Sequence, residues 1–535
     1  MKLPPPPADG LSLVRGIPLE QEVGLGSLTL CGYIREVTER YGPREAACIR
    51  TDQGMVRWTY TELWERAMEV ARALVACGVN KGTHVGILAT NRLEFLSAFF
   101  GAALAGGVAT TLSTFSTPSE LEILLEKSCC SVVLLERQVL KKDFAQMIVD
   151  LEPLVATTEA GKLASLKFPY LRHLALIDSD DSIGMIEGWS TFLARGAAVP
   201  PALVEASAAR IEPSDPGALF FSSGSTGKPK GILSAHRGVC LQLWRWPRWF
   251  DFKGDVRAWS ANGFFWSGNF GMALGGTLSC GGALILQRYF DPEEALRLLD
   301  RERATAIHAW PHQAAQLEQA PNWKDVDLSS IRSMDAVCKI KNHPTVNSDW
   351  HIPRCFGNTE TFTIISMLGS DVPEAVSGET HGIPTAGSTI KIMDPLSGET
   401  LPLGERGEIA VKGPTLMLGY VGIPLDETLD ENGFLATGDG GYFDEQGRLV
   451  WEGRINDIIK TGGANVSPVE IDAVIASCPG VKATQTVGVP DELLGELVVA
   501  CIIPHEGAKL DEDFVRNFVK EKLASYKVPR RVLFV

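Results

Sequence analysis

The first three hundred residues alternate between short apolar runs typical of buried strands and longer amphipathic runs typical of helices. Strand-like runs lie at 85–89, 283–287 and 305–309, and helix-like runs lie at 93–104 and 293–303. Alternation of this kind indicates β-α-β units, whose strands run parallel through right-handed connections. We therefore expect an α/β fold with helix-covered, largely parallel sheets.

The pattern changes after about residue 385. Short alternating runs at 388–393, 407–412 and 447–451 are separated by Gly and Pro, which is typical of antiparallel strands with one buried face. A second change follows Gly453–Arg454, after which the chain reads helix, strand, strand, helix. We expect a small β subdomain in a large N-terminal domain, followed by a small α+β C-terminal domain that can move as a lid.

Length, charge and composition narrow the function classes. A chain of 535 residues exceeds what one hydrophobic core usually holds, so two or more domains are expected. The 50 basic and 65 acidic side chains give a net charge of −15, which argues against nucleic acid or an anionic membrane as the main partner. The start, MKLPPPPADG, lacks the apolar core of a secretory signal, and no later segment is apolar enough to span a bilayer. Eleven cysteines without CxxC spacing argue against a zinc site. We expect a cytoplasmic protein.

A loop rich in glycine, hydroxyl groups and lysine follows the apolar run 218–221. Residues 222–231 read SSGSTGKPKG. Glycines let backbone N–H groups converge on an anion, and the hydroxyls and lysines add donors and positive charge. The spacing is too short for the GxxxxGK[ST] loop of P-loop NTPases, and a solvated Gly/Ser linker is the alternative. The predicted phosphate ligands are Ser222, Ser223, Gly224, Ser225, Thr226, Gly227, Lys228 and Lys230.

Two short acidic turns lie further along the chain. Residues 356–362 read FGNTETF and place Thr359 beside Glu360, where a hydroxyl suits a phosphate oxygen and a carboxylate suits Mg²⁺. In the turn Thr437–Gly438–Asp439, the carboxylate can accept hydrogen bonds from two ribose hydroxyls. Taken alone, either turn is equally well explained as an ordinary polar turn.

The stretch 453–472 is more specific. It reads GRINDIIKTGGANVSPVEID and joins an arginine, a polar pair, a lysine and a double glycine. The phosphate loop, the TE turn, the TGD turn and this stretch, in this order, resemble the adenylate-forming superfamily. That superfamily comprises acyl-CoA synthetases, peptide-synthetase adenylation domains and firefly-type luciferases, and the resemblance covers the chain from roughly residue 30 onward.

The resemblance implies a nucleotide site and a hinge. The phosphate loop would hold the β- and γ-phosphates of ATP, Thr359 the α-phosphate and Glu360 a Mg²⁺ ion. Members pivot two residues after the arginine, here at Asn456, where they usually carry Asp or Lys. This gives domains over 1–452 and 458–535, with a hinge over 453–457. Further nucleotide or CoA contacts would come from Asn358, Asp439, Arg454, Gly462 and Gly463. After the pivot, the glycine turn and Asn465 would line the tunnel that holds the pantetheine of CoA.

The resemblance also implies a two-step reaction. A carboxylate displaces pyrophosphate from ATP to give an acyl-adenylate, and the thiol of coenzyme A then displaces AMP. Two anions must approach in the first step, so cations and fixed donors carry most of the catalysis. The predicted catalytic residues are Thr359, Glu360 and Lys230. Rotation of the lid lets one cavity serve both steps.

The segment 259–286 predicts the acid. It contains no charged residue, whereas an amino-acid adenylating domain would offer a carboxylate to the amino group. Its glycines and aromatics suit a bulky uncharged acid, although packing in the core is an alternative. Phe265 stands where many acyl-CoA synthetases carry a histidine, so this chain has no histidine at that position to guide the thiol. The predicted pocket residues are Phe264, Phe265, Trp266, Gly268 and Phe270.

Two stretches depart from the family pattern. Residues 333–340 read SMDAVCKI where members usually have a glycine-rich turn against the adenine. The sequence ends at Val535, before the GK lysine that assists adenylation, and Lys527 lies in another motif. Either the chain is truncated, which we favour, or the protein works mainly on the second half-reaction.

We predict an acyl-CoA ligase for a bulky hydrophobic acid, whether polycyclic, aromatic or medium-chain. The first alternative is a thioesterification-only ligase that takes its acyl-adenylate from a partner enzyme. The second is an acyl-AMP ligase that loads a carrier protein, and a non-catalytic nucleotide-binding protein comes last. The sequence leaves a homodimer open.

Overall fold

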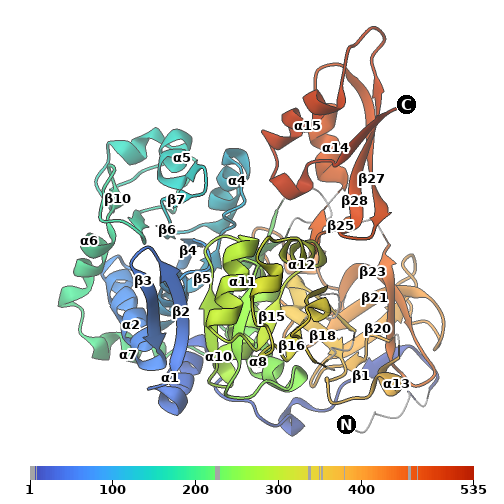
Figure 1. Ribbon diagram of the computed structural model, residues 1–535, viewed down its shortest axis with the longest axis horizontal. Coiled ribbons are helices and arrows are strands. Elements are labelled where there is room, and N and C mark those ends of the chain that lie inside the picture. Colours follow the sequence, from blue (N-terminus) through green and yellow to red (C-terminus); the bar gives the residue numbers. More distant parts are fainter. Residues whose placement is uncertain are drawn as a thin grey trace.

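The computed structural model describes residues 7, 9–222, 229–334, 339–348, 350, 354–378, 380–455, 459–466 and 468–535. A large domain holds the chain up to residue 455, and a small domain, called the lid from here on, holds residues 459–535 and stands above it (Figure 1). This arrangement confirms the predicted α/β class with a large N-terminal and a small C-terminal domain.

An eight-stranded sheet contains the strands that flank the phosphate loop. Neighbours from β10 through β11 run parallel, and β11, β12 and β22 pair antiparallel. The strand predicted over 85–89 is confirmed as β4. Lys230, which we placed in the loop, is the first residue of β12. In sheet order the strands are β10 (Ile186–Glu187), β9 (His173–Leu176), β6 (Val132–Leu135), β4 (His84–Leu88), β5 (Val108–Thr111), β11 (Pro216–Ser222), β12 (Lys230–Ala235) and β22 (Gly419–Tyr420).

A six-stranded sheet forms the second layer and contains the predicted strands over 283–287 and 305–309. All its neighbours run parallel except β2 and β3, which form an antiparallel hairpin. In sheet order the strands are β16 (Ser333–Met334), β15 (Ala306–His308), β13 (Arg257–Ser260), β14 (Ala283–Leu286), β2 (Glu45–Thr51) and β3 (Gly54–Thr59).

Helices separate and cover these two sheets. Buried residues of three helices form one cluster with residues of both sheets, so these helices lie between them: α1 (Leu30–Tyr41), α2 (Tyr60–Ala76) and α3 (Leu93–Leu104). Helices α11 (Pro292–Arg301) and α12 (Pro311–Glu318) pack on the six-stranded sheet, and α4 (Pro118–Ser128) and α5 (Phe144–Leu151) pack on the eight-stranded one. The layers alternate as expected for helix-covered sheets.

The predicted β subdomain is a five-stranded antiparallel sheet. Its order is β1 (Leu13–Arg15), β20 (Thr389–Met393), β21 (Gly407–Lys412), β23 (Leu435–Phe443) and β24 (Leu449–Arg454). The pairing of β1 with β20 brings the start of the chain to this subdomain, which the sequence pattern did not predict. A three-stranded sheet beside it, β17 (Cys355–Asn358), β18 (Thr363–Met367) and β19 (Ile383–Pro384), contains the TE turn between its first two strands.

The lid has its own hydrophobic core, formed where its two helices pack on its sheet. The predicted helices and central strands are present, and the hairpin β25–β26 and the last strand are additional. None of the helices in the described part of the protein has the length and apolar composition needed to cross a membrane. The lid elements are β25 (Ile459–Thr461), β26 (Ala464–Val466), α14 (Pro468–Ala476), β27 (Val481–Asp491), β28 (Gly495–Pro504), α15 (Glu512–Lys520) and β29 (Arg531–Phe534).

Candidate active site

The predicted catalytic turn is a short 3-10 helix, η7 (Thr359–Thr361), between strands β17 and β18. Asn358 precedes it, and its Oδ1 accepts the backbone N–H of Thr361 at 3.0 Å. Such a cap satisfies an orphan donor at the start of a helix and fixes the entry of the chain. In this structure Asn358 therefore positions Thr359 and Glu360.

The backbone leaves this turn in a strained conformation. Phe362 has φ 43° and Thr363 has φ 83°, a region that β-branched residues rarely adopt. Phe362 is fully buried, and its ring centroid lies 5.4 Å from that of Phe220 and 6.4 Å from that of Phe270. Strained residues persist where the surrounding structure over-determines them, as these aromatic contacts do. The aromatic core therefore holds the predicted catalytic turn in its conformation.

Tyr420 of β22 connects two of the predicted catalytic residues. Its hydroxyl donates to Oε1 of Glu360 at 2.9 Å, and Nζ of Lys230 lies 4.7 Å from the centre of its ring. Burial, followed by the negative charge of Glu360, raises the pKa of the Tyr420 phenol, which keeps the hydroxyl protonated as a donor. The structure therefore brings Lys230 and Glu360 together through a residue that the sequence analysis did not select.

Glu360 has the chemistry of a Mg²⁺ ligand. Its side chain is only partly buried, and the hydrogen bond from Tyr420 occupies one carboxylate oxygen. Mg²⁺ in nucleotide sites is commonly held by one or two carboxylates together with substrate phosphates. The residues present fit this ion.

Asp439, the predicted ribose ligand, is held by two neighbours. It lies on β23 opposite Arg454 of β24, and Nε of Arg454 is 3.3 Å from its Oδ1. The indole N–H of Trp451 donates to the same oxygen at 3.0 Å. Burial raises the pKa of Asp439 in spite of these contacts. These contacts fix the orientation of the Asp439 carboxylate. Arg454 also donates a hydrogen bond to the carbonyl oxygen of Thr437.

Lys460 of the lid lies beside Trp451, one of the two residues that hold Asp439. Its Nζ lies 2.9 Å from the centre of the Trp451 ring. Burial lowers the pKa of the Lys460 ammonium to about 8. The sequence analysis quoted this lysine within the stretch 453–472 but gave it no role. A lysine with a depressed pKa beside predicted nucleotide ligands is a functional-site candidate.

The glycine turn between β25 and β26 lies against the large domain. Gly462 and Gly463 have φ of 57° and 80°. A Cβ atom on Gly463 would stand 2.4 Å from the ring of Trp310, and one on Gly462 would stand 3.0 Å from Nδ1 of His312. Both positions therefore require glycine, for backbone conformation and for space.

A partly open cavity lies between the large domain and the lid; its enclosed volume is about 50 Å³, and about 510 Å³ when the open solvent at its mouth is included. Phe265 and Trp266 line it, and the ring of Trp266 lies 6.1 Å from that of Tyr526 in the lid. Ser222 and Pro229, the described neighbours of the phosphate loop, line it as well. The cavity thus joins the predicted acid pocket to the ends of the phosphate loop.

The other predicted pocket aromatics lie in the core. The Phe264 ring centroid is 5.7 Å from that of Phe95, and the Phe270 ring centroid is 4.3 Å from that of Phe99. Phe264 is 2% exposed and Phe270 is 0% exposed, so core packing, the alternative, describes both side chains. Gly268 is exposed, with open space where a Cβ would stand. Their role as acid contacts stays a prediction.

Several predicted site residues lie outside the described residues. They are Ser223, Gly224, Ser225, Thr226, Gly227, Lys228 and the hinge residue Asn456, together with part of the stretch 333–340. The two ends of the phosphate loop are nevertheless fixed, because Ser222 pairs with Lys230 across the hairpin β11–β12. The phosphate role of the loop stays a prediction.

Comparison with known proteins agrees with this geometry. The model of the AMP-binding enzyme family matches residues 34–421, and that of the AMP-binding enzyme C-terminal domain matches residues 470–535. A 3-[(3aS,4S,7aS)-7a-methyl-1,5-dioxo-octahydro-1H-inden-4-yl]propanoyl:CoA ligase of Mycobacterium tuberculosis is 32% identical over 509 residues, 92% of each chain. A feruloyl-CoA synthase of an Amycolatopsis species is 30% identical over 485 residues, 89% of each chain.

A solved structure shows the same architecture. The amide bond synthetase McbA of Marinactinospora thermotolerans superposes with a TM-score of 0.73 at 25% identity, over 94% of this chain and 95% of that one. Both family models and the two ligase relatives extend over the large domain and the lid. The chain therefore belongs to the AMP-binding enzyme family, within the acyl-CoA ligase branch of the adenylate-forming superfamily.

Proposed function

We propose that this AMP-forming acid–CoA ligase activates a bulky, uncharged carboxylic acid. The observation that carries the proposal is the charge of the cavity. Among the described residues that line it, only Glu120 and Lys527 carry a formal charge, and they pair with each other at 3.0 Å. Among the described lining residues, no charge is left unpaired for an amino group or a second carboxylate on the acid. The rest of the lining consists of aromatic and aliphatic groups together with Ser and Thr hydroxyls, which suit an uncharged ligand.

The relatives support the same class of acid. The name of the Mycobacterium tuberculosis ligase gives it a bicyclic propanoate, and the name of the Amycolatopsis enzyme gives it an aromatic acid. The rings of Phe265, Trp266 and Tyr526 in this cavity suit flat or polycyclic groups. A polycyclic or aromatic acid is therefore proposed first, with a medium-chain acid as the third class.

The described residues supply the charges that acyl-adenylate formation needs. Glu360 would hold Mg²⁺, which neutralises phosphate charge when bound. Lys230 stands beside Tyr420 at the end of the phosphate loop and offers a positive charge to the phosphates. Asp439, fixed by Arg454 and Trp451, would hold the ribose hydroxyls. Fixed charges of this kind lower the barrier because they need no reorganisation during the reaction.

The deciding experiment is a thioester screen with ATP, Mg²⁺ and CoA across polycyclic, aromatic, medium-chain and amino acids. We expect acyl-CoA, identified by mass spectrometry, from one of the first three classes. A product only from amino acids would contradict the proposal. Each acid is also supplied as its presynthesised adenylate, and each adenylate is offered to a pantetheine-bearing carrier protein in place of CoA.

These additional arms separate the alternative functions. Turnover of adenylates without acid-dependent pyrophosphate exchange would indicate a thioesterification-only ligase. Acylation of the carrier protein in preference to CoA would indicate a carrier-loading enzyme, and nucleotide binding without any product would indicate a non-catalytic protein. The cytoplasmic location and a homodimer are proposed from the sequence alone.

A further inference from the structure

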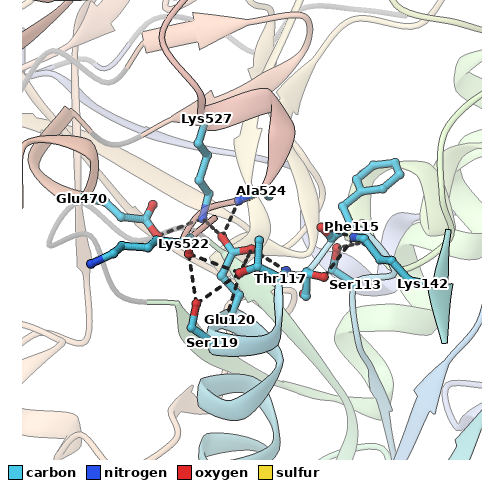
Figure 2. A network of polar contacts seen from close by, with 11 residues as sticks. Ser113, Phe115, Thr117, Ser119, Glu120, Lys142, Glu470, Lys522, Ala524 and Lys527 are labelled. Atoms are coloured by element: carbon cyan, nitrogen blue, oxygen red, sulfur yellow. Dashed lines mark hydrogen bonds and ion pairs between the residues drawn. The ribbon is translucent and has the colours of Figure 1, made fainter. Parts of the chain in front are cut away.

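A buried network of charged groups joins the lid to the large domain (Figure 2). Oε1 of Glu120, on helix α4, accepts from Nζ of Lys527 at 3.0 Å and from the backbone N–H of Ala524 at 3.1 Å. Nζ of Lys527 also donates to Oε1 of Glu470 at 2.9 Å, within the lid. We call these four residues the Glu120 latch. It connects positions 407 residues apart in the chain.

Glu120 divides its two carboxylate oxygens between two tasks. Oε2 accepts from the backbone N–H of Thr117 at 3.0 Å and from its hydroxyl at 3.1 Å, which closes the capping box of α4. Oε1 is left for the lid. Because the cap fixes the rotamer of Glu120, the oxygen that meets Lys527 is already oriented before the lid docks, which lowers the entropic cost of docking.

Neutral contacts extend the same interface. The hydroxyl of Ser119 donates to the carbonyl oxygen of Lys522 at 3.1 Å, and the hydroxyl oxygen of Thr117, whose hydrogen is donated to Glu120, lies 3.2 Å from the same carbonyl. On the large-domain side, Nζ of Lys142 donates to the carbonyl oxygens of the loop that leads into α4, including that of Phe115 at 2.7 Å (Figure 2). The surface that receives the lid is therefore held in place by its own domain.

The charged groups of the latch are buried, so the charge of Glu120 and the charge of Lys527 each need the other as a partner. Glu120 is 6% exposed, Glu470 is 7% exposed and Lys527 is 3% exposed. Burial alone would lower the pKa of Lys527, but the acidic groups of Tyr526, Glu120 and Glu470 outweigh it and raise that pKa, so the lysine stays charged. Removing one partner of a buried ion pair leaves the other charge uncompensated, which is strongly unfavourable.

The same lid orientation places the glycine turn against the large domain. While the latch is closed, Gly463 lies against Trp310 and Gly462 lies against His312. The lid has a single core, so these two separate contacts together fix its orientation. From the family resemblance, this is the turn that enters the site for the thiol-transfer step.

We propose that Glu120 is a positioning residue for thioester formation, because its bonds to Lys527 and Ala524 hold the lid in the orientation that places the Gly462–Gly463 turn in the active site. The proposal rests on the proposed two-step ligase function. Adenylate formation uses a different lid orientation in this scheme, so it does not need the latch. Glu120 also lines the cavity, but its contacts reach the glycine turn only through the lid.

The test compares the two half-reactions in the full-length protein. Lys527→Met and Glu120→Gln are expected to slow acyl-CoA formation from presynthesised acyl-adenylate and CoA at least tenfold. Because Glu120 and Lys527 also line the cavity, pyrophosphate exchange is measured at saturating acid, where it is expected to stay within about twofold of the wild type.

Matched controls separate the latch from general effects. Glu122→Gln changes a glutamate of the same helix that pairs with Lys167 inside the large domain, and Lys520→Met changes an exposed lysine of the lid. Both are expected to behave like the wild type in both half-reactions. Equal losses in the two half-reactions for Lys527→Met, or no loss of the thioester rate, would overturn the proposal.

A measurement without turnover distinguishes failure of the latch from failure of the proposed function. Hydrogen exchange of the peptide containing Ala524 reports directly on its bond to Glu120. Exchange in this peptide should accelerate at least tenfold in Glu120→Gln and stay unchanged in Glu122→Gln. Unchanged exchange in Glu120→Gln overturns the latch. Accelerated exchange in a protein that makes no thioester from any acid instead rejects the proposed function and leaves the docking contact established.

Discussion

The nucleotide side and the acid side of the candidate active site are built on different principles. On the nucleotide side, Glu360 and Lys230 keep partly exposed charges next to Tyr420, and Asp439 is held by only one of its oxygens. On the acid side, the aromatic rings around Trp266 face a cavity whose lining charges pair with each other. The nucleotide side leaves charges available to ATP, which is the same whichever acid is bound. The acid side selects among acids by shape.

This comparison predicts that substitutions on the nucleotide side affect all acids equally. Glu360→Gln removes the carboxylate charge expected to hold Mg²⁺, so acid-dependent pyrophosphate exchange should fall about 10²–10³-fold, the typical effect of losing one preorganised charged or polar contact. Tyr420→Phe, which removes only the hydroxyl donor to Glu360, is the control and should cost less than about tenfold. A loss confined to one acid class would break the comparison.

The second prediction separates the acid pocket from the core beneath it. Phe270→Ala should lower the free energy of unfolding by about 3–5 kcal/mol, measured by denaturant titration, because a fully buried ring is removed. Phe265→Ala should cost less stability, since Phe265 lines the cavity, and should instead alter the KM for the acid. If Phe270→Ala changed acid preference at unchanged stability, Phe270 would belong to the pocket as the sequence analysis proposed.

These aromatics show where sequence reasoning ends. Phe264, Phe265, Trp266 and Phe270 alternate with glycines in a charge-free stretch, and nothing local says which rings face the cavity. The π-helix over Phe270–Gly275 changes the side-chain period, so the direction of Phe270 cannot be extrapolated from a regular helix. The turns containing Glu360, Asp439 and Gly463 were found because their residues are contiguous. Tyr420 and Glu120 were not, because their partners are 60 and 407 residues away.

The third prediction concerns Lys460, the lysine that the lid contributes to the nucleotide side. Lys460 has a pKa of about 8, so it is charged below that pH and neutral above it. Any step that uses its charge should slow as the pH rises through 8. The ratio of wild-type to Lys460→Arg kcat/KM for thioester formation from acyl-adenylate should fall about tenfold per pH unit above 8.

The arginine variant makes this test specific. Arg stays protonated throughout the range, and both proteins use the same CoA thiol, whose ionisation cancels in the ratio. A constant ratio between pH 7 and 9.5 would show that the charge of Lys460 is not used. The nucleotide side would then consist of large-domain residues alone.

The smallest expected effect tests whether the acid side reads more than shape. Nε1 of Trp266 is buried and has no hydrogen-bond partner among the described residues, although the residue lines the cavity. A buried N–H without a partner is costly, so an acceptor on the bound acid, such as a ring ketone, would satisfy it. Trp266→Phe keeps an aromatic ring and removes the donor, so the KM for a keto-bearing polycyclic acid should rise about two- to tenfold. The KM for the matching acid without the ketone should stay unchanged, because that acid never used the donor. An equal rise for both acids would mean that Trp266 contributes only its surface, and the acid side would then select by shape alone.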